Sequence, residues 1–130
     1  MKKVLFMLLV AFGVLACNGQ QSNPGGGDVS VTEATGMVKQ DKELVILDVR
    51  TPEEYQSGHL AGAQNMNYYD ANFAQQLEDL PHDKRYLVYC HSGGRSAKAL
   101  KQMKESGFKE VYNLKGGVTA WKAEDGKIEK

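Results

Sequence analysis

The stretch that decides the fold is residues 85–100, RYLVYCHSGGRSAKAL. Its first six residues are mostly apolar and aromatic, as in a strand that is buried on both faces. Two glycines and Arg95 follow, and from 96 to 106 the apolar residues recur at the spacing of an amphipathic helix. The sequence therefore places Cys90 where a buried strand ends and a helix is about to begin.

The same alternation of strand-like and helix-like segments continues on both sides of this stretch. Thr32, followed by acidic Glu33, predicts the N-cap of one helix. Thr51 predicts another N-cap, because Pro52 suits the first helical position. Strands separated by single helices form parallel sheets with helices on both faces. The predicted fold class is therefore α/β, with helices over 32–40, 52–57, 70–80 and 96–106 and strands over 44–49, 63–67, 85–90 and 108–112.

The N-terminus has the pattern of an export signal. Lys2 and Lys3 precede an uncharged apolar run, 4–15, which is shorter than the roughly 20 residues that a membrane-spanning helix needs. The run ends in VLAC, which resembles the lipobox of bacterial lipoprotein signal peptides. This resemblance implies that residues 1–16 are removed and that Cys17 carries lipid, whereas an ordinary signal peptide would leave Cys17 as a free thiol. Either way we expect an exported, periplasmic protein, in the first case anchored to the membrane.

Domain boundaries follow from composition. Residues 17–28 are polar and glycine-rich, which predicts a flexible linker, and residues 29–130 form the predicted domain. Its polar end, KAEDGKIEK, is expected to be a solvated, partly disordered tail. Once the signal peptide is removed, 14 basic residues face 16 acidic ones, a formal charge of −2. This balance gives no electrostatic basis for nucleic-acid binding.

The residues after Cys90 can stabilise a thiolate. Gly93 and Gly94 permit backbone conformations that turn successive N–H groups toward one point, and the start of a helix adds further free N–H groups. Arg95 adds a positive charge. These groups favour a lowered pKa and a nucleophilic sulfur over a cysteine that is merely buried as a small apolar residue. Asp48 and Arg50 also lie at the carboxyl end of a strand, the edge at which such sheets bind ligands.

The spacing from Cys90 to Arg95 distinguishes two kinds of loop that hold an anion around a cysteine. Cysteine phosphatases place five residues between the cysteine and the arginine, which leaves room for phosphate. Here four residues, 91–94, intervene, and the shorter loop resembles that of the rhodanese, or thiosulfate sulfurtransferase, family. Two further segments resemble that family's other signatures: LDVRTPEEYQSGHLAGAQNM at 47–66 and LKGGVTAW at 114–121.

The resemblance implies a single rhodanese-like domain, three layers with a central parallel sheet, in which Cys90 carries a sulfur atom as a persulfide. The implied activity is sulfur transfer from a small sulfur-containing anion, such as thiosulfate, to cyanide or a thiol, with no metal or organic cofactor. Asp48 and Arg50 match motif positions for which a supporting role behind the loop is expected. The residues implied to bind the donor and stabilise the persulfide are His91, Ser92, Gly93, Gly94, Arg95 and Ser96.

Two other functions stay open from the sequence. A rhodanese-like module could bind a partner without catalysis or only carry a persulfide to it. A phosphatase or arsenate reductase on the related fold would need one more loop residue. A histidine of ordinary pKa is mostly neutral at pH 7, and His91 stands where several family members known for using thiosulfate carry a full positive charge. The identities of the donor and of the acceptor are therefore open.

Overall fold

A five-stranded, wholly parallel sheet forms the centre of the protein, whose computed structural model describes residues 25–130. The strand order is β1-β6-β5-β2-β4, and a separate antiparallel pair joins β3 to β7. This arrangement confirms the predicted α/β class. The strands are β1 Asp28–Val29, β2 Val45–Asp48, β3 His59–Leu60, β4 Gln64–Asn65, β5 Arg85–Tyr89, β6 Glu110–Leu114 and β7 Ile128–Glu129.

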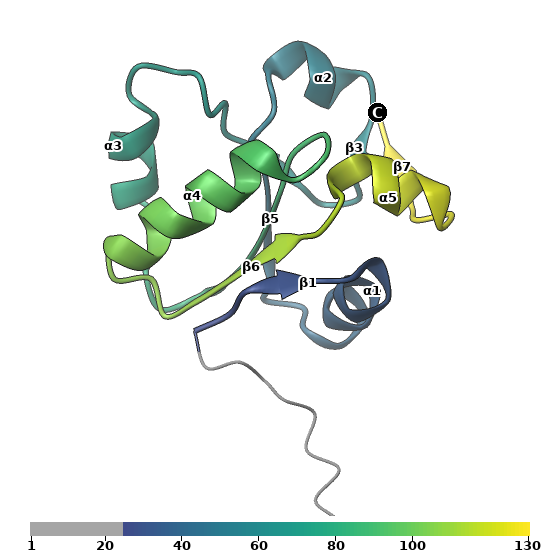
Figure 1. Cartoon of the computed structure of the whole chain (residues 1–130), viewed down its shortest axis with the longest axis horizontal. Coiled ribbons are helices and arrows are strands. Elements are labelled where there is room, and N and C mark those ends of the chain that lie inside the picture. Colours follow the sequence, from purple (N-terminus) through teal and green to yellow (C-terminus); the bar gives the residue numbers. More distant parts are fainter. Residues whose placement is uncertain (1–24) are drawn as a thin grey trace, which may run out of the picture.

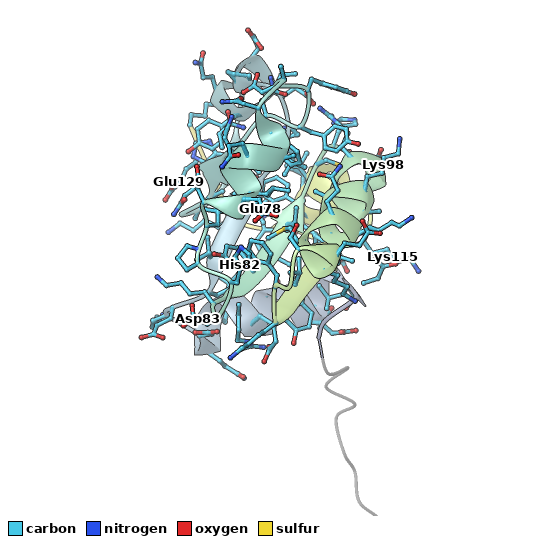
Figure 2. All side chains as sticks on the ribbon, turned by 90° about the vertical axis from the view of Figure 1, so that its left-hand side faces the viewer. Glu78, His82, Asp83, Lys98, Lys115 and Glu129 are labelled. Carbon is cyan, nitrogen blue, oxygen red and sulfur yellow. The ribbon has the colours of Figure 1, made fainter. Side chains whose placement is uncertain are left out.

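Helices cover both faces of the sheet (Figure 1). Because side chains alternate along a strand, β5 contributes side chains to the hydrophobic cores on both faces of the sheet. Leu87 and Tyr89 pack with α1 and α5. Tyr86 and Val88 pack with α3 and α4. Figure 2 looks onto the α3 and α4 layer. The helices are α1 Val31–Gln40, α2 Pro52–Gln56, α3 Phe73–Glu78, α4 Gly94–Glu105 and α5 Gly117–Ala123.

The two predicted N-caps had different outcomes. Thr51 caps α2 as predicted, with its side chain accepting from the Glu54 N–H in a full capping box. For α1 the prediction was wrong, because Ser30 rather than Thr32 is the N-cap and accepts from the Glu33 N–H at 3.1 Å. Because Val31 is buried in the core, the helix begins earlier than the local sequence pattern indicates.

The glycines before β1 belong to the sheet edge rather than to a flexible linker. The carbonyls of Gly25 and Gly27 accept hydrogen bonds from the Val111 and Asn113 N–H groups, at 3.2 and 2.9 Å. A Cβ atom on Gly26 would lie 1.8 Å from the Val111 carbonyl oxygen. Residues 25–27 therefore run directly against β6, and Gly26 leaves no room there for a side chain.

Predictions for the N-terminal segment lie outside the described residues. Cys17, its lipid and the signal peptide over 1–16 fall in that segment, and residues 25–130 contain no helix long and apolar enough to cross a membrane. The predicted export and anchoring therefore stay predictions.

The C-terminal tail is ordered, contrary to the expectation of a partly disordered end. Ile128 pairs with Leu60, and Glu129 with His59. The Trp121 indole N–H donates to the Lys127 carbonyl at 3.1 Å. The tail's polar composition concealed this pairing, because its partner strand lies about half the chain away.

Candidate active site

Cys90 follows β5 directly, and its sulfur sits at the centre of the loop that leads into α4. The residue is only 1% exposed. The Gly93 N–H donates to Sγ at 3.0 Å, and the Ser96 hydroxyl donates to it at 3.3 Å. Gly93 has φ +114°, a conformation that glycine adopts readily and that turns its N–H back toward the sulfur. Helix α4 begins at Gly94, two residues earlier than predicted, so the turn is tight.

The environment of Cys90 favours its thiolate. Burial raises the pKa of the thiol, but hydrogen bonds from the Ser96 hydroxyl and from backbone N–H groups of Ser96, Gly93 and Ser92 outweigh burial and lower the pKa below its ordinary value. A lowered pKa increases the fraction of nucleophilic thiolate at neutral pH. The surroundings of Cys90 therefore favour a nucleophilic thiolate over a neutral thiol.

Arg95 is tied to α2, which the sequence did not predict. Its two terminal nitrogens donate to the two carboxylate oxygens of Glu54 at 2.8 and 3.0 Å. The bond from Arg95 lowers the pKa of Glu54 to about 2, so this carboxylate is ionised at neutral pH. The Arg95 guanidinium also lies over the Tyr69 ring, 5.5 Å from its centroid. The arginine charge beside the loop is therefore balanced by Glu54, which was not predicted as a site residue.

Asp48 and Arg50 form a buried network at the carboxyl end of β2. Arg50 Nη2 lies 2.7 Å from the Asp48 carboxylate and also donates to the Gly58 carbonyl at 2.7 Å. The Tyr89 hydroxyl donates to the same carboxylate at 2.6 Å and accepts from the Leu60 N–H at 3.0 Å. Tyr89 was not predicted as a site residue because an apolar strand hides its hydroxyl. The network joins β2, β3 and β5, and its member Tyr89 directly precedes Cys90 in the chain.

The segment LKGGVTAW brings the start of α5 onto the loop backbone. The Val118 N–H donates to the Cys90 carbonyl at 2.9 Å, and the Thr119 N–H donates to the His91 carbonyl at 3.2 Å. Gly117 has φ +58°, and a Cβ atom there would lie 2.5 Å from both carbonyl oxygens. Only glycine fits this close approach, so α5 fixes the loop from the side opposite α4.

A groove of about 660 Å³ opens beside the loop, between α2 and α5. Figure 1 shows these two helices flanking the loop that precedes α4. The groove reaches His91, the exposed residue next to Cys90. Its lining residues are Arg50, Glu54, Ser57, His91, Val118, Thr119, Lys122 and Ala123.

Residues 25–130 contain no group of three His, Cys, Asp or Glu side chains arranged to hold a metal ion. The geometry around Cys90 consists instead of hydrogen-bond donors, Gly93 and Ser96 foremost, that suit a sulfur anion. The expectation of a site without metal or cofactor stays a prediction.

Comparisons with known proteins agree with this geometry. The chain is 38% identical over 95 residues to the thiosulfate sulfurtransferase GlpE of Coxiella burnetii, a match that covers 73% of this chain and 86% of the relative. It is 34% identical over 109 residues to MoeZ of Mycobacterium tuberculosis, named a probable adenylyltransferase/sulfurtransferase. That match covers 84% of this chain but only 28% of MoeZ.

Solved structures and a family model lead to the same assignment. The rhodanese-like domain of an Anabaena protein superposes with a TM-score of 0.70 at 28% identity, covering 78% of this chain and 77% of that one. The sequence model of the rhodanese-like domain matches residues 30–124. The chain therefore belongs to the rhodanese family and is related to sulfurtransferases.

Proposed function

We propose that this protein is a sulfurtransferase that carries a sulfane sulfur as a persulfide on Cys90. The observation that carries the proposal is the buried Cys90 sulfur with hydrogen bonds from the Gly93 N–H and the Ser96 hydroxyl. The lowered pKa of Cys90 supports it, because the thiolate is the form that attacks a sulfur donor. Kinship with GlpE, a thiosulfate sulfurtransferase, supports the same reaction class.

The proposed reaction has two half-reactions. The Cys90 thiolate attacks the outer sulfur of thiosulfate, a new S–S bond forms, and sulfite leaves with the electron pair of the broken S–S bond. An acceptor thiolate or cyanide then attacks the outer sulfur of the persulfide, and Cys90 leaves as a thiolate. The loop N–H groups and the Ser96 hydroxyl stabilise the anionic sulfur in both steps.

The loop residues have separate proposed roles. Gly93 and Ser96 contact the sulfur through the bonds described above, and the Ser92 N–H also faces it. His91 lies at the rim, beside the groove. Arg95 is a positioning residue, because its terminal nitrogens are occupied by Glu54 rather than free to hold an anion.

A persulfide carrier is the second candidate function, and the Arg95–Glu54 pair favours it. Because Glu54 balances the charge of Arg95, the loop offers less attraction for a dianion such as thiosulfate than a free arginine would. Such a site suits a donor of low charge, including a persulfide presented by a partner. A phosphatase is not favoured, because only four residues, His91 to Gly94, lie between Cys90 and Arg95, one fewer than in the cysteine phosphatase loop.

We also propose export and lipid anchoring at Cys17, on the sequence pattern alone. Labelling of the full chain with a radioactive fatty acid in a bacterial host tests this proposal. Incorporation that is lost in Cys17→Ser supports the lipoprotein. Periplasmic protein without the label supports an ordinary signal peptide.

The activity is tested on the chain carrying Cys17→Ser, so that Cys90 is the one remaining thiol. The protein is incubated with thiosulfate, and its intact mass is measured before and after cyanide is added. A gain of one sulfur atom, removed by cyanide with release of thiocyanate and absent in Cys90→Ser, supports the proposal. No gain from thiosulfate but a gain from a persulfide donor supports the carrier. No gain from either donor contradicts both.

A further inference from the structure

The groove between α2 and α5 holds one charged side chain whose charge is not balanced within the described residues. Arg50 is paired with Asp48, and Glu54 is paired with Arg95. Lys122 is exposed on α5 and forms no ion pair within residues 25–130. The groove therefore presents one uncompensated positive charge.

The other walls of the groove suit a short organic stem. Ala123 contributes exposed apolar surface, while Ser57 and Thr119 contribute hydroxyl groups. A volume of about 660 Å³ falls in the range of small-molecule sites, roughly 300–1,000 Å³, and is too small for a folded partner. The lining chemistry thus fits a small molecule with one anionic group.

His91 connects this groove to the nucleophile. It directly follows Cys90 in the chain and lines the groove. The Thr119 hydroxyl donates to the His91 carbonyl at 3.0 Å. The Thr119 hydroxyl oxygen also lies 3.5 Å from the His91 ring nitrogen Nε2. Because the backbone of α5 also bonds the Cys90 carbonyl, the groove is fixed relative to the reactive loop.

We propose that the groove between α2 and α5 is the sulfur-acceptor subsite and that it takes a small anionic thiol. The proposal rests on the sulfurtransferase function above. The carboxylate of the thiol pairs with Lys122, and its stem lies along Ala123. Its thiolate attacks the outer sulfur of the Cys90 persulfide, an S–S bond forms to the acceptor, and the bond to Cys90 breaks with its electron pair returning to the Cys90 thiolate.

The test measures single-turnover sulfur transfer from the loaded Cys17→Ser chain. Three thiols with different charges are compared: thioglycolate is anionic, mercaptoethanol neutral and cysteamine cationic. The second-order rate constant for each thiolate is read from the loss of the extra sulfur in the intact mass. In Lys122→Gln we expect the thioglycolate rate constant to fall about two- to fivefold and that of mercaptoethanol to stay unchanged, as for the loss of one exposed ion pair. In Lys122→Glu we expect the rate constant of cysteamine to exceed that of thioglycolate, the reverse of the order expected in the parent.

Lys98→Gln is the matched control. Lys98 is also exposed, but it lies on α4, on the other side of the sheet, where Figure 2 labels it. If the effect belongs to the groove, removal of the Lys98 charge leaves the ratio of the thioglycolate and mercaptoethanol rate constants unchanged. An equal change in Lys98→Gln, or no change in Lys122→Gln, overturns the proposal.

A second measurement separates this proposal from the proposed function. Iodoacetate and iodoacetamide alkylate Cys90 without any persulfide and differ in charge. If the chain accepts no sulfur from any donor, the sulfurtransferase proposal fails. The ratio of the two alkylation rates still decides whether Lys122 guides anions to Cys90: a fall in Lys122→Gln supports the groove, and an unchanged ratio contradicts it.

Discussion

At the scale of single residues, Ser96 is the side chain on which the reactivity of Cys90 depends most directly. Its hydroxyl is completely buried and lies 3.3 Å from the Cys90 sulfur and 3.2 Å from the Gly93 carbonyl. A hydroxyl has one proton to donate, so it donates to the sulfur when the thiolate forms and to the Gly93 carbonyl when the thiol is protonated. Ser96 therefore stabilises the Cys90 thiolate at little cost to the stability of the protein with a neutral Cys90 thiol.

Replacement of Ser96 by alanine should raise the pKa of Cys90. The thiolate loses a hydrogen bond to a charged acceptor, so the rate of alkylation by iodoacetamide at pH 7 should fall about tenfold, and the midpoint of its pH profile should move upward. Ser92→Ala is the control, because only the backbone N–H of Ser92 is directed at the sulfur. Identical pH profiles for Ser96→Ala and the parent would contradict the assigned role.

At the scale of secondary-structure elements, the loop is held by contacts from two helices that are remote in sequence. Glu54 of α2 forms an ion pair with Arg95 in the first turn of α4. From α5, backbone N–H groups bond the carbonyls of Cys90 and His91. The reactive loop is short, and its shape depends on these neighbours as much as on its own glycines.

The ion pair between α2 and α4 should make stability depend on pH. The pKa of Glu54 is lowered from its ordinary 4.5 to about 2 in the folded state. The pair therefore stabilises the fold above pH 4.5, and this contribution is lost as the pH falls toward 2. In urea unfolding, Glu54→Gln should be about 0.5–1 kcal/mol less stable than the parent at pH 7, and the difference should shrink at pH 3.

Glu53→Gln is the matched control for that measurement. Glu53 also lies in the first turn of α2 but forms no ion pair within the described part of the chain. Its replacement should give a smaller difference at pH 7 with little change between the two pH values. A constant difference for Glu54→Gln across this range would show that the ion pair does not stabilise the fold.

The contact between α5 and the loop should make Gly117 intolerant of a side chain. Gly117→Ala combines a left-handed backbone with a Cβ atom 2.5 Å from two carbonyl oxygens, so we expect a loss of about 2–4 kcal/mol in the free energy of unfolding. Gly62→Ala is the control, because Gly62 has φ +80° but no atom within 4 Å of the added Cβ. That control should lose only about 1–2 kcal/mol. Equal losses in urea unfolding would mean that the close approach to the loop is not the cause.

At the scale of the whole molecule, the ends of the described chain complete the sheet system. Residues 25–29 run along β6, and β7 pairs with β3 near the carboxyl edge of the main sheet. The C-terminal strand also brings Ile128 against the α1 and α5 core and covers the Trp121 indole. Both ends thus contribute to stability despite their polar or glycine-rich composition.

Deletion of residues 127–130 should expose the indole and weaken the fold. Trp121 is the one tryptophan of the chain, so its fluorescence reports this region alone. We expect a red shift of the emission and a loss of about 1–2 kcal/mol in the free energy of unfolding, from the buried surface of Ile128 and the lost hydrogen bonds. Deletion of Lys130 alone should change neither quantity. Unchanged emission after the longer deletion would contradict a structural role for β7.

The features that the sequence predicted well are those set by neighbours in the chain. The strand before Cys90 and the N-cap at Thr51 depend on local patterns, and the structure has both. The features that were missed depend on distant partners. Glu54 meets Arg95 across 41 positions, and β7 pairs with a strand about 70 residues earlier. A single sequence carries no periodicity or spacing rule for such contacts.

The direction of the first strand determines which edge of the domain lies next to a surface that holds the chain on its N-terminal side. From residue 25 the chain runs parallel to β6, from the amino edge of the sheet toward the carboxyl edge. Cys90 follows the carboxyl end of β5. A surface that holds the chain at residue 25 therefore lies on the side of the amino edge, and Cys90 lies at the opposite edge. Small substrates and large partners alike can then approach Cys90 from open solution, without entering the gap between the domain and that surface.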